Sequence, residues 1–177
     1  MAEKSTGSLL ALLVLAGAAV YLAVWPHELG HAAAAWLLGC KAEAWRTGTR
    51  WFLWGSQGGE IDFGCLARRG RGALALTNLA GISINLLLAG LAGLIGVWWR
   101  PVTERRAWWL TATLLWALAN YAEAFSYLIF NSLWLKSDMA GAVAATGISR
   151  WIWFAAGTMT AWRLGAGCCQ WREGLRT

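Results

Sequence analysis

The stretch from Leu9 to Leu38 is apolar over most of its length, yet it contains three ionisable side chains, His27, Glu28 and His31. As one straight helix it would measure about 45 Å, against about 30 Å for the hydrocarbon core of a membrane. Such a segment has to tilt, kink or protrude. Pro26 lacks a backbone N–H and disfavours helix at the residue before it, so we expect the helix to break and restart there.

His27 and His31 lie four residues apart, and Glu28 follows the first histidine directly. On a helix this spacing places both imidazoles on one face, so both can bind a single metal ion. The His-Glu-x-x-His pattern is typical of zinc sites that keep one position open for water, where Glu28 would take the proton of that water as it attacks a carbonyl. Each ionisable group at membrane depth costs about 2.5–3.5 kcal/mol, which favours a functional metal site here.

The composition excludes a water-soluble domain. Of 177 residues, 58% are hydrophobic and 14% are charged, and 15 are tryptophans. So much apolar surface predicts one all-α polytopic membrane domain covering residues 1–177. The formal charge of +6 comes from basic residues that cluster between apolar segments, where they favour lipid head groups over nucleic acid.

Apolar segments predict about four transmembrane helices, over residues 9–38, 73–99, 107–135 and 151–169. The interfacial loop at 39–72 holds aromatic residues around a glycine-rich turn, which predicts a short interfacial β-hairpin. A loop anchored by its tryptophans is the alternative. Four spans place both termini on one side, and the basic residues then divide equally between the two faces, so charge does not orient the protein.

The chain has four cysteines, and none of them shows Cys-x-x-Cys spacing. They therefore indicate neither a zinc ribbon nor a disulfide framework, and we expect reduced thiols. The four are Cys40, Cys65, Cys168 and Cys169.

Two histidines do not complete a catalytic zinc site, which normally has three protein ligands. The candidates for the third are Glu123, Asp138 and the cysteines. Glu123 lies within the third expected span, whereas Asp138 begins a short helix after that span. His27 is expected toward the same face of the membrane as Asp138, so its depth favours Asp138.

Asn85 lies in the middle of the second expected span. An amide at that depth needs a hydrogen-bond partner, and two roles fit equally: a contact between helices or a contact with the substrate backbone. We take Asn85 as a candidate substrate-binding residue.

Residues 26–32, Pro-His-Glu-Leu-Gly-His-Ala, followed by Gly-Cys-Lys at 39–41, resemble the first motif of the site-two-protease-type intramembrane zinc metalloproteases. Residues 81–85, Gly-Ile-Ser-Ile-Asn, resemble the middle-span element of that family, with isoleucine where proline is usual. Residues 131–138 resemble the segment that ends at the third metal ligand, without its usual prolines. This last segment is closest to the compact, peptidase-like membrane branch that lacks a PDZ domain.

The resemblance implies that zinc is bound by His27, His31 and Asp138, with Glu28 as the general base. It also implies a multi-pass protein of the cell membrane whose active site opens toward the cytosol.

Three functions fit these features. The first is a zinc-dependent intramembrane endopeptidase, which hydrolyses peptide bonds in or near a transmembrane segment of a membrane-protein substrate through a water activated by Glu28. The second is a non-proteolytic membrane scaffold or chaperone that retains zinc. The third is a zinc-dependent hydrolase of lipid-soluble small molecules. The sequence carries no signal for an oligomeric state.

Overall fold

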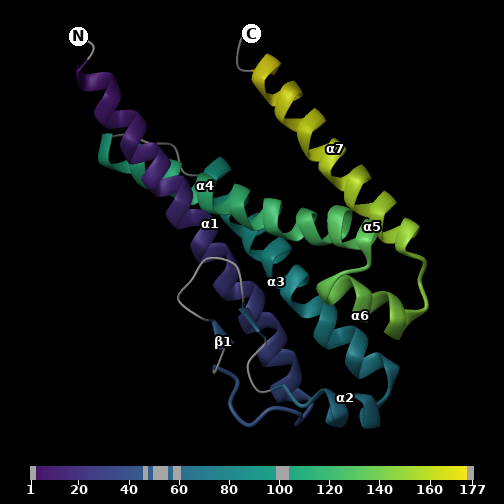
Figure 1. Ribbon diagram of the computed structural model, residues 1–177. Coiled ribbons are helices and arrows are strands. Elements are labelled where there is room, and N and C mark those ends of the chain that lie inside the picture. The colour runs from purple at the N-terminus through teal and green to yellow at the C-terminus, as the bar shows by residue number, and fades with distance from the viewer. Residues whose placement is uncertain (1–2, 46–47, 50–55, 58–60, 99–103, 175–177) are drawn as a thin grey trace.

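The chain folds into a bundle of helices that begins with a long N-terminal helix (Figure 1). The structure, a computed structural model, describes residues 3–45, 48–49, 56–57, 61–98 and 104–174. This part of the chain is all-helical apart from one pair of two-residue strands, which confirms the expected all-α class.

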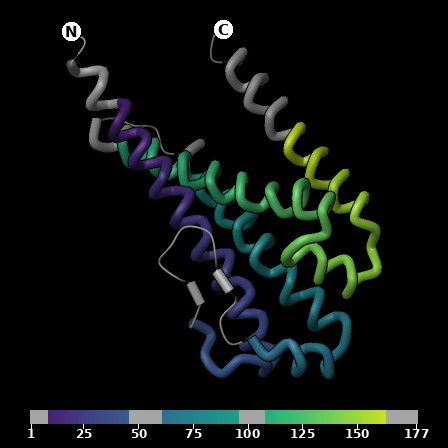
Figure 2. Tube along the Cα trace, viewed as in Figure 1, coloured from purple at the N-terminus to yellow at the C-terminus, as the bar shows by residue number. Residues whose placement is uncertain are grey.

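The central helix is α3, which packs against α1, α4 and α6. The chain runs along α1, returns along α3, crosses back in α4 and turns through α6 before it enters α7 (Figure 2). The helices are α1 Glu3–Leu37, α2 Phe63–Arg69, α3 Arg71–Trp98, α4 Glu104–Phe125, the π-helix η1 Ser126–Asn131, α5 Ser132–Trp134, α6 Ser137–Thr146 and α7 Arg150–Gly174, and the strands are β1 Gly48–Thr49 and β2 Ser56–Gln57.

Helix α1 is continuous through Pro26. The expectation that the helix restarts at this proline is therefore wrong. The proline ring removes one backbone N–H, but a continuous helix keeps its other hydrogen bonds within the segment, and an apolar environment favours that arrangement. As a result, the two histidines lie on the same continuous helix as the apolar residues before them.

The distribution of side chains is the reverse of that in a water-soluble protein. Leu10 and Leu13 on α1 are 64% and 61% exposed, whereas His27, Asn85 and Asn120 are buried. In water, large apolar side chains are mostly inside and amides mostly outside. This arrangement agrees with helices that are long and apolar enough to cross a membrane.

Two helical segments, Leu9–Leu37 and Arg71–Ile95, are long and apolar enough to cross a membrane. Only 11% and 28% of their most apolar windows are buried, so they are not the enclosed core helices of a soluble domain. No other helix in the described part of the chain meets the same criteria. The spans expected at 107–135 and 151–169 therefore stay predictions.

The third expected span is not one regular helix. After α4 the chain continues as the π-helix η1 and the short α5, and it then turns sharply at Leu135, which has a left-handed φ of 48°. Helix α6 follows and ends at Gly147, whose φ of 73° is the left-handed conformation expected of a glycine that terminates a helix.

The loop after α1 differs from the expected hairpin. Strands β1 and β2 pair antiparallel over two residues each, which is too short to form the predicted interfacial β-hairpin. The aromatic residues on which that prediction depended lie largely outside the described residues. Helix α2 follows instead, capped by the carboxylate of Asp62, which accepts a hydrogen bond of 2.8 Å from the backbone N–H of Cys65.

Cys40 and Cys65 form a disulfide, so the expectation of reduced thiols is wrong for this pair. Their Cα atoms lie 5.5 Å apart, within the usual range for a disulfide. The backbone supports the same contact, because Asp62 N–H donates to the carbonyl of Cys40 at 3.0 Å. The disulfide fixes α2 against the end of α1. Cys168 and Cys169 lie in a part of α7 whose side chains are outside the described residues.

Candidate metal centre

His27 and His31 lie one turn apart on the buried face of α1, and the start of α6 brings Asp138 to them. Nε2 of His27 and Nε2 of His31 are 3.0 Å apart. One carboxylate oxygen of Asp138, Oδ2, lies 3.0 Å from the first and 3.1 Å from the second. Asp138 is more than 100 positions from both histidines in the sequence. The three side chains thus converge on one point and can hold a metal ion.

Thr77 on α3 orients His31. Nδ1 of His31 donates to the backbone carbonyl of Thr77 at 2.6 Å, which leaves Nε2 with a free lone pair directed at the cluster. A hydrogen bond of this kind on the outer nitrogen is the usual way in which a protein fixes a metal-binding histidine. The ring of His27 is held differently, by stacking on Tyr127 with centroids 4.5 Å apart and planes inclined by 24°.

The donor set fits a divalent cation. When Nε2 of His31 is unprotonated, this nitrogen and the Asp138 carboxylate are both hydrogen-bond acceptors, and they lie 3.1 Å apart. A cation between them stabilises that contact. Ligands about 2.05 Å from a tetrahedral zinc ion are about 3.3 Å from one another. The observed separations of 3.0–3.1 Å are close to that value. Two imidazoles and a carboxylate are also a donor set that zinc accepts.

Helices α1 and α3 approach most closely beside this cluster. A Cβ added to Gly30 would lie 2.7 Å from the carbonyl oxygen of Ala80. A Cβ added to Gly81 would lie 2.5 Å from Nε2 of His31 and 2.8 Å from Nε2 of His27. Glycine at position 81 therefore keeps open the space on which the two imidazole nitrogens converge.

A strained turn presents Asp138. Leu135 and Ser137 both have left-handed φ values, 48° and 52°, which are uncommon for residues other than glycine. Such strain is found where the fold has to place a side chain against its local preference.

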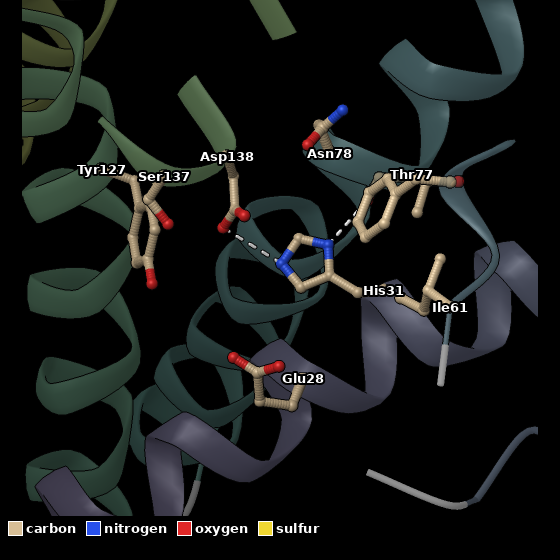
Figure 3. Close-up of a pocket in the computed structure, with 9 residues that line it drawn as sticks. Glu28, His31, Ile61, Thr77, Asn78, Tyr127, Ser137 and Asp138 are labelled. Atoms are coloured by element: carbon tan, nitrogen blue, oxygen red, sulfur yellow. Dashed lines mark hydrogen bonds and ion pairs between the residues drawn. The ribbon is translucent and has the colours of Figure 1, made fainter. Parts of the chain in front are cut away.

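A cavity of about 90 Å³ adjoins the cluster. Glu28, His31 and Asp138 line it, and Figure 3 shows their side chains directed toward a common space. The remaining lining comes from the loop before α2, from α3, from η1 and from the start of α6, namely Ile61, Phe63, Thr77, Asn78, Tyr127 and Ser137. Since liquid water occupies about 30 Å³ per molecule, the cavity has room for a few waters beside Glu28.

Asn85 does not line this cavity. It is completely buried, and neither atom of its amide has a hydrogen-bond partner. Asn78, two turns earlier on α3, lies at the cavity instead, with one amide N–H donated to the carbonyl of Leu74 at 2.7 Å. The structure thus brings together every expected ligand and the expected base, but not the expected substrate contact.

Glu123, the alternative third ligand, is not part of the cluster that can hold a metal. It is partly buried on α4, one helical turn before Tyr127. Asn78, Thr77 and Tyr127 are the cavity residues that the sequence did not single out as site residues. A signal for Asn78 was present, because it lies three residues before Gly81 and so shares a helix face with it.

Comparisons of the chain with protein-family models, with curated proteins and with solved structures find no match.

Proposed function

We propose that this protein is a zinc-dependent intramembrane endopeptidase, which hydrolyses peptide bonds in or near a transmembrane segment of a membrane-protein substrate. One observation carries the proposal: His27, His31 and Asp138 form a cluster that can hold a metal ion, and a cavity with room for a few waters, lined by Glu28, adjoins it in a bundle with large apolar side chains on its outer surface. The resemblance of residues 26–32 to intramembrane zinc metalloproteases supports the same function.

His27, His31 and Asp138 would hold the zinc ion, which supplies Lewis acidity toward a carbonyl and lowers the pKa of water when bound. Glu28 lines the same cavity and accepts a proton from the attacking water as its oxygen bonds to the scissile carbon. The carbonyl π electrons move to oxygen. When the C–N bond breaks, Glu28 returns the proton to the departing nitrogen, so the glutamate ends the reaction ionised.

The substrate has to unwind before it can react, because a helical peptide bond is shielded by its own backbone hydrogen bonds. Ile61 and Phe63 line the cavity, so a peptide strand that enters it would contact both residues. Both residues flank Asp62, whose backbone is hydrogen-bonded to Cys40. The disulfide between Cys40 and Cys65 therefore restrains the segment that forms this wall of the cavity.

We further propose a multi-pass protein of the cell membrane, in which α4 with η1 and α7 complete a set of four spans. The proposed opening of the cavity to the cytosol rests on the resemblance. Cys65 lies close in sequence to Ile61 and Phe63, which line the cavity, so the disulfide lies near the cavity. Disulfides persist in oxidising compartments. In a cytosolic orientation we therefore expect Cys40 and Cys65 to be free thiols in cells. Their disulfide would then form only in an oxidising medium.

The test is the Glu28→Gln variant, which keeps the shape of the side chain but cannot accept the proton. We expect this variant to retain one zinc per chain and to lose cleavage of single-span peptides in detergent micelles by at least about 100-fold, the contribution typical of a general base. Mass spectrometry of the peptides and metal analysis of the protein measure the two quantities. Equal cleavage by Glu28→Gln and wild type would exclude the proposed mechanism.

The retained-zinc scaffold predicts another outcome. A scaffold binds zinc at His27, His31 and Asp138 but shows no cleavage that depends on Glu28. A deletion phenotype rescued equally by wild type and by Glu28→Gln would therefore favour the scaffold.

A further inference from the structure

Tyr127 lines the site, and the proposed reaction so far gives it no role. Its ring stacks on His27, and its side chain lines the cavity with Glu28 and Asp138. It is carried by η1, a π-helix within an otherwise α-helical segment. Such π-helical turns are rare and occur frequently at functional sites.

The packing around Tyr127 makes its position definite. The ring contacts the core cluster formed by Ile82, Ala124, Met139 and Ala142, which belong to three different helices. Stacking on His27 restrains the ring further. A donor that is fixed before the reaction pays no reorganisation cost during it.

Hydrolysis of a peptide bond places negative charge on the carbonyl oxygen, and a neutral donor in the cavity stabilises that charge. Few lining residues can supply one. Asn78 donates one of its two amide N–H groups to Leu74, which leaves only the second N–H for the cavity, and Figure 3 shows the Thr77 hydroxyl on the far side of His31 from Asp138. In the same view the hydroxyl of Tyr127 and the carboxylate of Glu28 extend to the same side of Asp138.

We infer that Tyr127 is a catalytic residue whose phenol donates a hydrogen bond to the oxyanion formed from the scissile carbonyl. This inference rests on the proposed endopeptidase function and assigns a further residue to it. The phenol stays protonated throughout: it stabilises the charge, while Glu28 alone accepts and returns the proton. Ser137, the other hydroxyl at this edge of the cavity, is the competing donor.

The experiment compares Tyr127→Phe with Tyr121→Phe and Ser137→Ala. Tyr121 lies on α4 and stacks on Phe125 with centroids 5.9 Å apart, and it does not line the cavity, so its variant is the matched control. For Tyr127→Phe we expect kcat on a cleaved single-span peptide to fall by about 100-fold, as for the loss of one oxyanion donor. We expect KM to change by less than about 3-fold, because the bond forms only in the transition state.

Two measurements separate this role from a structural one. The zinc content of Tyr127→Phe should equal that of wild type, because no ligand is lost. The affinity for a phosphinic peptide, whose tetrahedral anion imitates the oxyanion, should fall by about the same factor as kcat. Tyr121→Phe should leave both quantities unchanged.

The remaining outcomes each decide something. Wild-type kcat and phosphinate affinity in Tyr127→Phe would overturn the inference and leave the endopeptidase function intact, and a loss confined to Ser137→Ala would assign the donor to Ser137 instead. Loss of zinc from Tyr127→Phe would give the tyrosine a structural role and also overturn the inference. If no variant and no wild-type protein cleaves, but Tyr127→Phe still loses phosphinate affinity, the endopeptidase function fails and Tyr127 is an anion-binding donor.

Discussion

Both halves of α1 are rich in apolar residues and expose large apolar side chains, but the second half also has a buried face that carries ionisable side chains. In the first half, Leu10, Leu13 and Val14 are 61–64% exposed. In the second half, His27 and Ala35 are at most 1% exposed. One continuous helix therefore presents large apolar side chains outward at one end and encloses ionisable side chains at the other.

The difference shows how the bundle makes room for a polar site. Where α1 meets α3, the contact residues are glycines and alanines, and the two backbones lie close enough for Thr77 to bind His31 through its carbonyl. Close approach through small residues is the usual basis of helix packing in membranes. The outer half of α1 needs no such fit, because lipid tails adapt to whatever side chain they meet. Substitutions in the two halves should therefore have very different effects.

The largest effect is expected from the ligands themselves. Asp138→Ala, His27→Ala and His31→Ala should each abolish stoichiometric zinc binding, since each removes one of three protein ligands. Glu123→Gln is the matched control, because Glu123 lies near the cluster without belonging to it. Metal analysis of protein purified in detergent measures the outcome.

Full zinc occupancy in Asp138→Ala, together with loss in Glu123→Gln, would reverse the ligand assignment. It would also mean that Asp138 at the start of α6 does not lie against the two histidines of α1.

The second effect tests whether the enclosed half depends on the space at Gly81. In Gly81→Ala the new methyl group would meet the Nε2 atoms of both histidines, so we expect zinc affinity to fall by about 100-fold although every ligand remains. That change corresponds to about 2.7 kcal/mol. Gly90→Ala on the same helix is the control, because a Cβ there meets nothing within 4 Å. Competition with a chelator measures both affinities, and equal values for the two variants would show that the helices are not held this closely.

The site was predictable from sequence where local geometry decides it. The spacing of His27 and His31 places them on a common face of any helix. The expected position of Asp138, at the start of a helix after the third span, put it at the same membrane depth as His27 and so favoured it over Glu123 as the third ligand. Tyr127 was not predictable, because it reaches the cavity through the π-helical turn of η1, for which the sequence has no clear pattern. The cavity is lined by Asn78 and not by Asn85 for a related reason: the two share a helix face, and only the position of α1 along α3 decides which of the two amides meets the cavity, so substrate binding by Asn85 stays a prediction.

The fold, too, was predictable where local geometry decides it and not where long-range packing does. Apolar length predicted the helices, since the requirement to satisfy backbone hydrogen bonds within the segment is local. The disulfide between Cys40 and Cys65 was missed because the partners are 25 residues apart, and only the docking of α2 on α1 brings them together. Pro26 was overestimated as a helix breaker, because its effect depends on what surrounds the helix rather than on its own ring.

The smallest effects test the comparison most directly, through two apolar substitutions on the same helix. Ala35 is completely buried, so Ala35→Leu inserts extra methylene groups where the packing leaves no space, and overpacking of this kind costs about 1–3 kcal/mol. Leu13 is 61% exposed, so Leu13→Ala should change the free energy of unfolding by no more than about 0.5 kcal/mol. Thermal unfolding in detergent should therefore show a lower midpoint for Ala35→Leu and an unchanged midpoint for Leu13→Ala.

Equal shifts would mean that the outer half of α1 is packed against protein, either another segment of this chain or a second subunit. A lower midpoint for Leu13→Ala alone would reverse the two halves and remove the main support for an apolar solvent around the bundle.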